Sequence, residues 1–269
     1  MGELDERALD AAMAADPDAV LGLLVDMASA TDERLRLLAL RAATRVVIDR
    51  ARRGLPRRTG VGKLRTVPAD RGGDLDVDAS IESITEARAR RTAPNVADLS
   101  ARAWARPELA LCLVVDAPGS MHGERLAAAV VTAAACALRA PGDLAVLAFS
   151  RTADVIRPMK AQQPASSTVQ RLLRLKGHGV TSVDAALKEA SKQLEQTRAA
   201  RKVVLLLSDC RVTDERDPVS AARTLDELIV IAPAEDCDEA AAFARQAGAH
   251  WFPLTGPAAA ADVVRAALG

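Results

Sequence analysis

Residues 108–121 read ELALCLVVDAPGSM and join an apolar run to an abrupt polar end. The run from Leu109 to Val115 is typical of a buried parallel strand, because both faces of such a strand are covered. Asp116 ends the run, and a turn that contains Pro118 and Gly119 follows. Open α/β sheets place their ligands at the carboxyl ends of strands. We therefore expect Asp116 to belong to a functional site.

The sequence from this stretch to the C-terminus alternates between strand and helix patterns. Strands are expected at residues 109–115, 144–149, 155–156, 203–207, 228–232 and 251–254. Helices are expected at residues 124–138, 168–175, 183–196, 219–224, 236–246 and 257–268. This alternation predicts an α/β fold, in which a doubly wound, mostly parallel central sheet is flanked by helices.

Three regions follow from the patterns along the chain. Residues 1–53 carry apolar positions at helical spacing, and Asp16 before Pro17 is typical of a helix start. Residues 54–107 are interpreted as a basic connector with short helices, and 54–75 are expected to be irregular because they are rich in Gly, Pro and Arg. Residues 108–269 form the α/β domain.

Composition narrows the classes of function. The 269 residues have zero formal net charge, 2% aromatic residues and no tyrosine, which disfavours nucleic acid as a partner. The acidic start does not resemble a secretory signal and no apolar run could span a bilayer, so we expect a cytoplasmic protein without membrane contact. The four cysteines lack metal-site spacing. Cys112 and Cys136 are interpreted as reduced core residues, while an exposed, reactive thiol at Cys210 stays open.

Two further oxygen-bearing residues stand where predicted strands end or helices begin. Thr181 lies in KGHGVTSVDAAL, and Asp209 ends the strand pattern in KVVLLLSDCRVTD. Together with Asp116 and Ser120, their order resembles the metal-ion-dependent adhesion site (MIDAS) of the von Willebrand factor A (VWA) family. The family pattern is D-x-S-x-S, then a distal Thr and a distal Asp. The first serine of that pattern is Pro118 here.

The resemblance implies a Rossmann-like VWA fold with an antiparallel edge strand, for which residues 155–156 are the candidate. It also implies a Mg²⁺ or Mn²⁺ site formed by Asp116, Ser120, Thr181 and Asp209. Hard divalent cations prefer oxygen ligands of this kind. Proline offers no side-chain oxygen and no backbone N–H, so two interpretations stay open. The site is weakened but binds metal, or it is vestigial and the same surface binds a partner without metal.

A second similarity concerns the region before the α/β domain. The Gly-Asp-Leu-Asp segment at residues 73–76 resembles the linker of magnesium chelatase D subunits and CoxE-like VWA proteins. This similarity implies a non-catalytic interaction module that acts with a MoxR-type AAA+ ATPase in metal insertion or maturation of a client protein. The chain itself lacks the G-x-x-x-x-G-K-[ST] phosphate-binding motif, so a partner would supply the ATPase.

An enzyme is the competing hypothesis. A hydrolase could use Ser120 as nucleophile, with a histidine, His122, His178 or His250, as base. The nucleophile elbow G-x-S-x-G and the dinucleotide fingerprint G-x-G-x-x-G are both absent. No catalytic residue is therefore predicted. Each of the four candidate metal ligands could alone be a helix cap or turn residue, but single caps do not explain why all four follow the family's order.

Overall fold

The computed structural model describes residues 6–28, 33–53, 63–71, 74–105, 109–116, 123–175, 181–211 and 216–269. The chain divides into two compact units. The larger unit comprises residues 1–56 and 109–269, and the smaller comprises residues 57–108.

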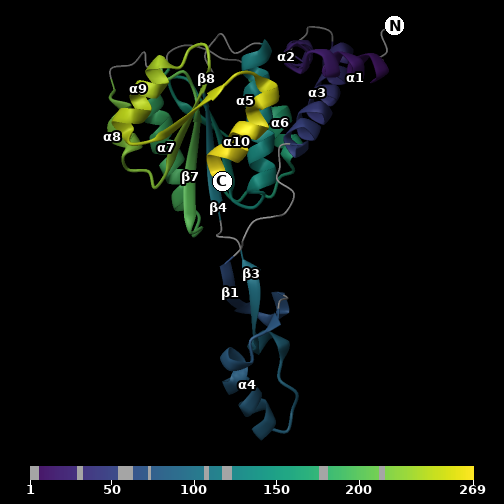
Figure 1. Ribbon diagram of the computed structural model, residues 1–269, viewed down its shortest axis with the longest axis vertical. Helices are drawn as coiled ribbons and strands as arrows, with labels where there is room; N and C mark the ends of the chain where they lie inside the picture. Colours follow the sequence, from purple (N-terminus) through teal and green to yellow (C-terminus); the bar gives the residue numbers. More distant parts are fainter. Residues whose placement is uncertain are drawn as a thin grey trace. The chain divides into compact units, whose positions relative to one another are not determined.

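A six-stranded sheet forms the centre of the larger unit (Figure 1). Its order is β6 (Ala153–Arg157), β5 (Leu144–Phe149), β4 (Leu109–Asp116), β7 (Arg201–Leu207), β8 (Leu228–Pro233) and β9 (His250–Leu254). The strands pair in parallel, except that β6 runs antiparallel to β5 at the edge. The predictions of a mostly parallel sheet and of an antiparallel edge strand near residues 155–156 are confirmed.

Helices cover both faces of this sheet, as a doubly wound fold requires (Figure 1). One face carries α2 (Pro17–Ala28), α3 (Glu33–Arg53), α5 (Gly123–Arg139), α6 (Ala165–Leu172) and α10 (Ala260–Leu268), which follows the short 3₁₀ helix η3 (Pro257–Ala259). The other face carries α7 (Val183–Glu195), α8 (Pro218–Ala222) and α9 (Asp238–Ala247). None of the helices in the described ranges is long and apolar enough to cross a membrane.

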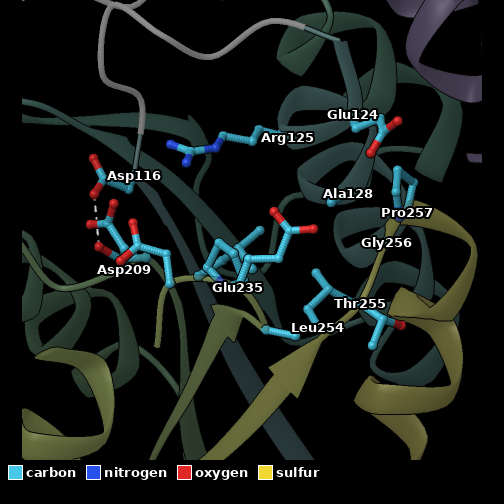
Figure 2. Close-up of a pocket in the computed structure, with 15 residues that line it drawn as sticks. Asp116, Glu124, Arg125, Ala128, Asp209, Glu235, Leu254, Thr255, Gly256 and Pro257 are labelled. Atoms are coloured by element: carbon cyan, nitrogen blue, oxygen red, sulfur yellow. Dashed lines mark hydrogen bonds between the residues drawn. The ribbon is translucent and has the colours of Figure 1, made fainter. Parts of the chain in front are cut away.

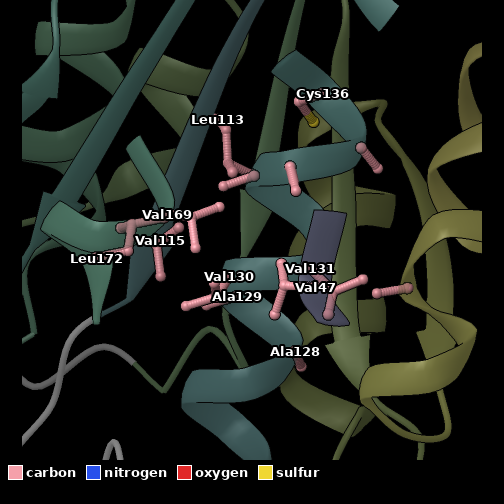
Figure 3. Packing of buried hydrophobic residues seen from close by; sticks show 14 of the residues in the cluster. Val47, Leu113, Val115, Ala128, Ala129, Val130, Val131, Cys136, Val169 and Leu172 are labelled. Carbon is pink, nitrogen blue, oxygen red and sulfur yellow. The ribbon is translucent and has the colours of Figure 1, made fainter. Parts of the chain in front are cut away.

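The central strand β4 shows why its sequence is apolar throughout. Leu111, Leu113 and Val115 pack into the cluster under α5 (Figure 3), and the alternate residues pack under α7 on the opposite face. Successive side chains of a strand point to opposite faces, and both faces of β4 are buried. A continuous apolar run is the pattern that this environment selects.

The helices of the N-terminal region belong to the larger unit. Helix α1 (Glu6–Ala15) packs on α2, and α2 and α3 pack against α5, where Val47 of α3 lies beside Val131 (Figure 3). Residues 126–137 of α5 are buried all round, because the sheet lies on one side and helices on the other. Their many alanines allow this close approach. The Asp16 carboxylate caps α2 by accepting a hydrogen bond from the Ala19 N–H at 3.0 Å, as the sequence predicts.

The smaller unit corrects one prediction. Residues 54–75 are expected to be irregular, yet β1 (Lys63–Pro68) and β2 (Asp74–Leu75) lie in this range and pair antiparallel with β3 (Ser100–Ala105). Helix α4 (Val77–Ala89) confirms the predicted short helix, and the 3₁₀ turns η1 (Ala69–Arg71) and η2 (Val96–Asp98) complete the unit. Asp76 caps α4 and pairs with Arg102 at 2.8 Å, which joins the helix to the sheet.

Candidate functional site

The carboxyl ends of β4 and β7 lie side by side at the centre of the sheet. The chain leaves β4 through α5 on one face, and it reaches β7 through α7 on the opposite face. This change of face is the topological switch point of the fold, where open α/β sheets leave a crevice outside the strand ends. Asp116 ends β4 and Asp209 follows β7, so topology brings these two predicted site residues to the same crevice.

A hydrogen bond across the two strand ends holds the Asp116 carboxylate. The Ser208 hydroxyl donates to Asp116 Oδ2 at 2.7 Å, and Ser208 Oγ accepts from the Cys210 N–H at 2.9 Å. Asp116 is only 7% exposed, and its second oxygen, Oδ1, is buried without a hydrogen-bond partner in the described part of the chain. A buried carboxylate oxygen without a partner is costly, which makes Oδ1 the natural point for a ligand.

Burial dominates the electrostatics of this carboxylate. The pKa of Asp116 is raised to about 6, mainly by burial and also by the nearby charge of Asp209. The Ser208 hydrogen bond and the positive charge of Arg125 act in the opposite direction. A buried carboxylate beside a second carboxylate favours either a proton or a bound cation.

A tight turn after β7 positions Asp209. Asp209 Oδ1 accepts a hydrogen bond from the Arg211 N–H at 3.1 Å, and Cys210 between them adopts a left-handed φ of 60°. Residues other than glycine rarely adopt this backbone conformation, and such residues cluster at functional sites. Cys210 itself is buried, and burial raises the pKa of its thiol to about 12. The alternative of an exposed, reactive thiol is therefore wrong.

A pocket of about 220 Å³ opens beside Asp116 and Asp209 (Figure 2). Helix α5 supplies one wall, with the Arg125 side chain extending toward Asp116. The ends of β8 and β9 supply the rest, and Glu235 lies between the two aspartates and Thr255 in the view. The full lining is Asp116, Glu124, Arg125, Ala128, Leu207, Ser208, Asp209, Pro233, Ala234, Glu235, Asp236, Leu254, Thr255, Gly256 and Pro257. Carboxylates outnumber the single arginine, so the pocket favours a positively charged ligand.

The other candidate site residues are not among the described lining of this pocket. Thr181 is buried just before α7, next to Ser182, whose N–H donates to the Ser150 carbonyl past the end of β5 at 2.8 Å. It does not belong to the described lining of the pocket. Ser120 lies outside the described residues, as do Pro118, His122 and His178. His250 begins β9 at the amino ends of the parallel strands, whereas Asp116 lies at the carboxyl end of β4, so His250 is not placed to act as a base there.

The donor set of the crevice is made of oxygen atoms, which fits a hard cation better than a soft one. The orphaned Asp116 Oδ1 and the neighbouring Asp209 supply the charge for such an ion. Across the described residues, no three His, Cys, Asp or Glu side chains gather closely enough to hold a metal by themselves. Hydroxyl groups or water would have to complete the coordination, as Mg²⁺ commonly allows.

Two contributors to the site escaped the sequence analysis. Ser208 stands between an apolar run and Asp209, and its position at a strand end was the available signal. Arg125 lies in the first turn of α5 and looks in sequence like an ordinary exposed helix residue. Their roles depend on which strands and helices become neighbours.

Comparison with known proteins identifies the family. Residues 42–246 match the family described as VWA domain containing CoxE-like protein. No curated protein matches the chain. An aerotolerance-related membrane protein from Bacteroides fragilis is 13% identical, with 60% of this chain and 98% of that chain covered and a TM-score of 0.47. A von Willebrand factor type A protein from Catenulispora acidiphila is 19% identical, with 61% and 43% covered and a TM-score of 0.47. BatB from Bacteroides thetaiotaomicron is 12% identical, with 60% and 97% covered and a TM-score of 0.47.

Proposed function

Because the chain belongs to the family of VWA domain containing CoxE-like proteins, we propose that it is a non-catalytic protein-interaction module. Its partner in this proposal is a MoxR-type AAA+ ATPase, and the pair serves metal insertion or maturation of a client protein. The absence of a P-loop motif from the sequence supports a division of labour, in which the partner hydrolyses the nucleotide and this chain provides the contact.

One observation carries the proposal: Asp116 is a buried carboxylate with an unsatisfied oxygen at the edge of an open pocket. Burying an ionised carboxylate is unfavourable unless a proton, a cation or hydrogen bonds compensate. Ser208 compensates one oxygen and leaves the other. A surface that needs a positive charge at its centre is suited to binding through a metal ion or through a basic group of the partner.

We propose that a divalent cation, Mg²⁺ or Mn²⁺, fills this place. Asp116 and Asp209 would supply the negative charge, and Ser120 and Thr181 would supply hydroxyl oxygens. When bound, the cation supplies an open coordination position that a carboxylate of a partner protein can occupy. Water would take the place of the serine oxygen that Pro118 lacks, and the site would be weaker than one with a serine there.

The test is a pull-down with the tagged full chain from an extract of its own cells. It is run in Mg²⁺ and in EDTA and read by mass spectrometry. The matched variants are Asp116→Ala at the crevice and Asp226→Ala, an exposed carboxylate that precedes the amino end of β8, away from the carboxyl ends that form the crevice. We expect an AAA+ ATPase to be retained in Mg²⁺ by the wild type and by Asp226→Ala, and lost in EDTA or with Asp116→Ala.

Two results would contradict parts of the proposal separately. Equal retention of the ATPase in EDTA and by Asp116→Ala would show that protein surface alone makes the contact, so that the cation has no role. Retention of no AAA+ ATPase in either buffer would overturn the partner assignment.

A further inference from the structure

A carboxylate from the N-terminal helices holds the start of α5. Asp26 Oδ1 of α2 accepts a hydrogen bond from the Gly123 N–H at 2.8 Å, across 97 positions of sequence. Gly123 has a left-handed φ of 54°, which glycine adopts without strain. The first N–H groups of a helix have no partner within the helix, and a negative charge there also suits the helix dipole. Asp26 therefore fixes the place where α5 begins.

A second carboxylate of the same helix holds the segment after β9. Asp18 Oδ1 accepts from the Ala258 N–H at 2.6 Å, and the Arg50 Nε of α3 donates to the Ala258 carbonyl at 2.9 Å. Gly256 lies so close to this carboxylate that a β-carbon there would stand 2.4 Å from Asp18 Oδ2. The N-terminal helices therefore bind both the N–H and the carbonyl of Ala258, and Asp18 packs against Gly256.

The two segments that these hydrogen bonds hold, the start of α5 and residues 256–258, are next to or part of the walls of the pocket. Glu124 and Arg125, which follow Gly123, line it on the α5 side, and residues 254–257 line it on the other (Figure 2). The loop that carries Ser120 joins Asp116 to Gly123 in sequence. Movement of either segment would change the width of the pocket and the approach to Asp116. Groups that orient ligands from outside the contact shell commonly affect metal affinity by 10–100-fold.

We propose that Asp18 and Asp26, with Arg50, are positioning residues that fix the two walls of the Asp116 pocket, so that the N-terminal helices are a working part of the binding site. The cation readout of this inference rests on the proposed function. The inference goes beyond that function because it gives residues 6–53 a defined task at the site, in place of simple coverage of the sheet.

The test compares full-length chains that carry both substitutions at once. Asp18→Ala/Asp26→Ala removes both acceptors, while Asp18→Asn/Asp26→Asn keeps an oxygen acceptor at each position. Asp10→Ala, an exposed carboxylate of α1, is the control. Hydrogen exchange reports the mobility of residues 123–128 and 254–258, calorimetry with Mn²⁺ reports binding, and a thermal melt verifies that each variant is folded.

We expect the double alanine variant to exchange faster in both segments and to bind Mn²⁺ about tenfold more weakly than wild type. The double asparagine variant should recover most of both properties, and Asp10→Ala should match wild type. Wild-type Mn²⁺ affinity in a folded double alanine variant would overturn the inference. If wild type binds no Mn²⁺, the cation of the proposed function is excluded. The hydrogen-exchange comparison alone then tests the positioning role. Unchanged exchange in both segments would then overturn the positioning role.

Discussion

The Ser208 hydroxyl donates a hydrogen bond to Asp116 Oδ2 at 2.7 Å and thereby ties the ends of two neighbouring strands together. Asp116 closes β4, and Ser208 directly follows β7, its parallel partner in the sheet. The bond satisfies one carboxylate oxygen and directs the other toward a place where no described group meets it. The geometry therefore gives Asp116 a defined orientation before any ligand arrives, and preorganisation of this kind reduces the cost of binding.

Removal of that hydroxyl should raise the pKa of Asp116 above its present value of about 6. The Ser208 bond stabilises the charged carboxylate, while burial and the charge of Asp209 oppose it. The measurement is a ¹³C NMR titration of the Asp116 carboxyl in Ser208→Ala and in wild type. Ser220→Ala, an exposed hydroxyl on α8, is the control and should leave the curve in place. An unchanged or lower pKa in Ser208→Ala would contradict the prediction.

The raised pKa also predicts how stability depends on pH in metal-free buffer. Burial moves the pKa of Asp116 from its ordinary value of 3.8 to about 6, so between these values the folded chain holds a proton that the unfolded chain has lost. The contribution of Asp116 to stability therefore falls as pH rises through this window. Asp116→Asn, which cannot ionise, should gain on wild type by up to roughly 3 kcal/mol from about pH 4 to about pH 7.

Denaturant unfolding in EDTA at several pH values in that range checks this difference. A constant difference between wild type and Asp116→Asn would show that Asp116 has the same pKa in the folded and the unfolded chain. Addition of Mg²⁺ at neutral pH should reverse the order, because a ligand that binds only the folded chain stabilises it. Only wild type should gain from the ion.

Position 118 allows a direct test of the metal site. Pro118→Ser restores the missing hydroxyl of the family pattern and should tighten Mn²⁺ binding about tenfold, whereas Asp116→Ala should abolish it. Isothermal calorimetry of wild type and the two variants measures the affinities. Identical traces for the three proteins would exclude a cation at this site. Mn²⁺ binding by Asp116→Ala with the affinity of wild type would place the ion elsewhere.

Most of the sheet could be predicted because its inner strands are largely buried. Residues 144–149 match β5 at both ends, since a strand covered on both faces is apolar over its whole length. Strands β1 and β3 escaped prediction for the opposite reason. They carry residues such as Lys63, Arg65 and Arg102, and they form by pairing with each other across 32 to 42 positions of sequence. Pairing at such a distance leaves no local pattern.

The candidate site shows the same division. Asp116 and Asp209 could be placed together because both end apolar runs of a parallel sheet. The contacts of Asp18 with Ala258 and of Asp26 with Gly123 could not be foreseen, since they depend on which helix packs on α5. A carboxylate on an amphipathic helix has no sequence signal that separates a long-range acceptor from a solvated charge.

The buried position of Cys210 predicts the order in which thiols react. Burial raises the pKa of the Cys210 thiol to about 12, and the charges of Asp209 and Asp116 act in the same direction. The thiolate is the nucleophile, so Cys210 should be alkylated far more slowly than the half-buried Cys237. Peptide mass spectrometry after timed exposure of the native protein to iodoacetamide checks this order. Equal rates at the two positions would contradict the buried site.

The contact between Gly256 and Asp18 predicts a coupled effect on stability. A β-carbon at Gly256 would stand 2.4 Å from Asp18 Oδ2, so Gly256→Ala must displace the carboxylate and break its bond to the Ala258 N–H. The backbone at Gly256 is extended, which alanine adopts freely, so the cost arises from this contact alone. We expect a loss of about 1–3 kcal/mol, which is the usual range for overpacking.

A double-mutant cycle tests whether the cost passes through Asp18. Asp18→Ala removes the clashing oxygen, so Gly256→Ala should cost clearly less in that background than in wild type. Gly142→Ala, where a β-carbon would meet nothing within 4 Å, is the matched control and should leave the melting temperature nearly unchanged. Additive losses in the cycle would mean that residue 256 acts independently of α2. Coupled losses would show that the N-terminal helices and this wall of the pocket form one packed structure, as the positioning role of Asp18 requires.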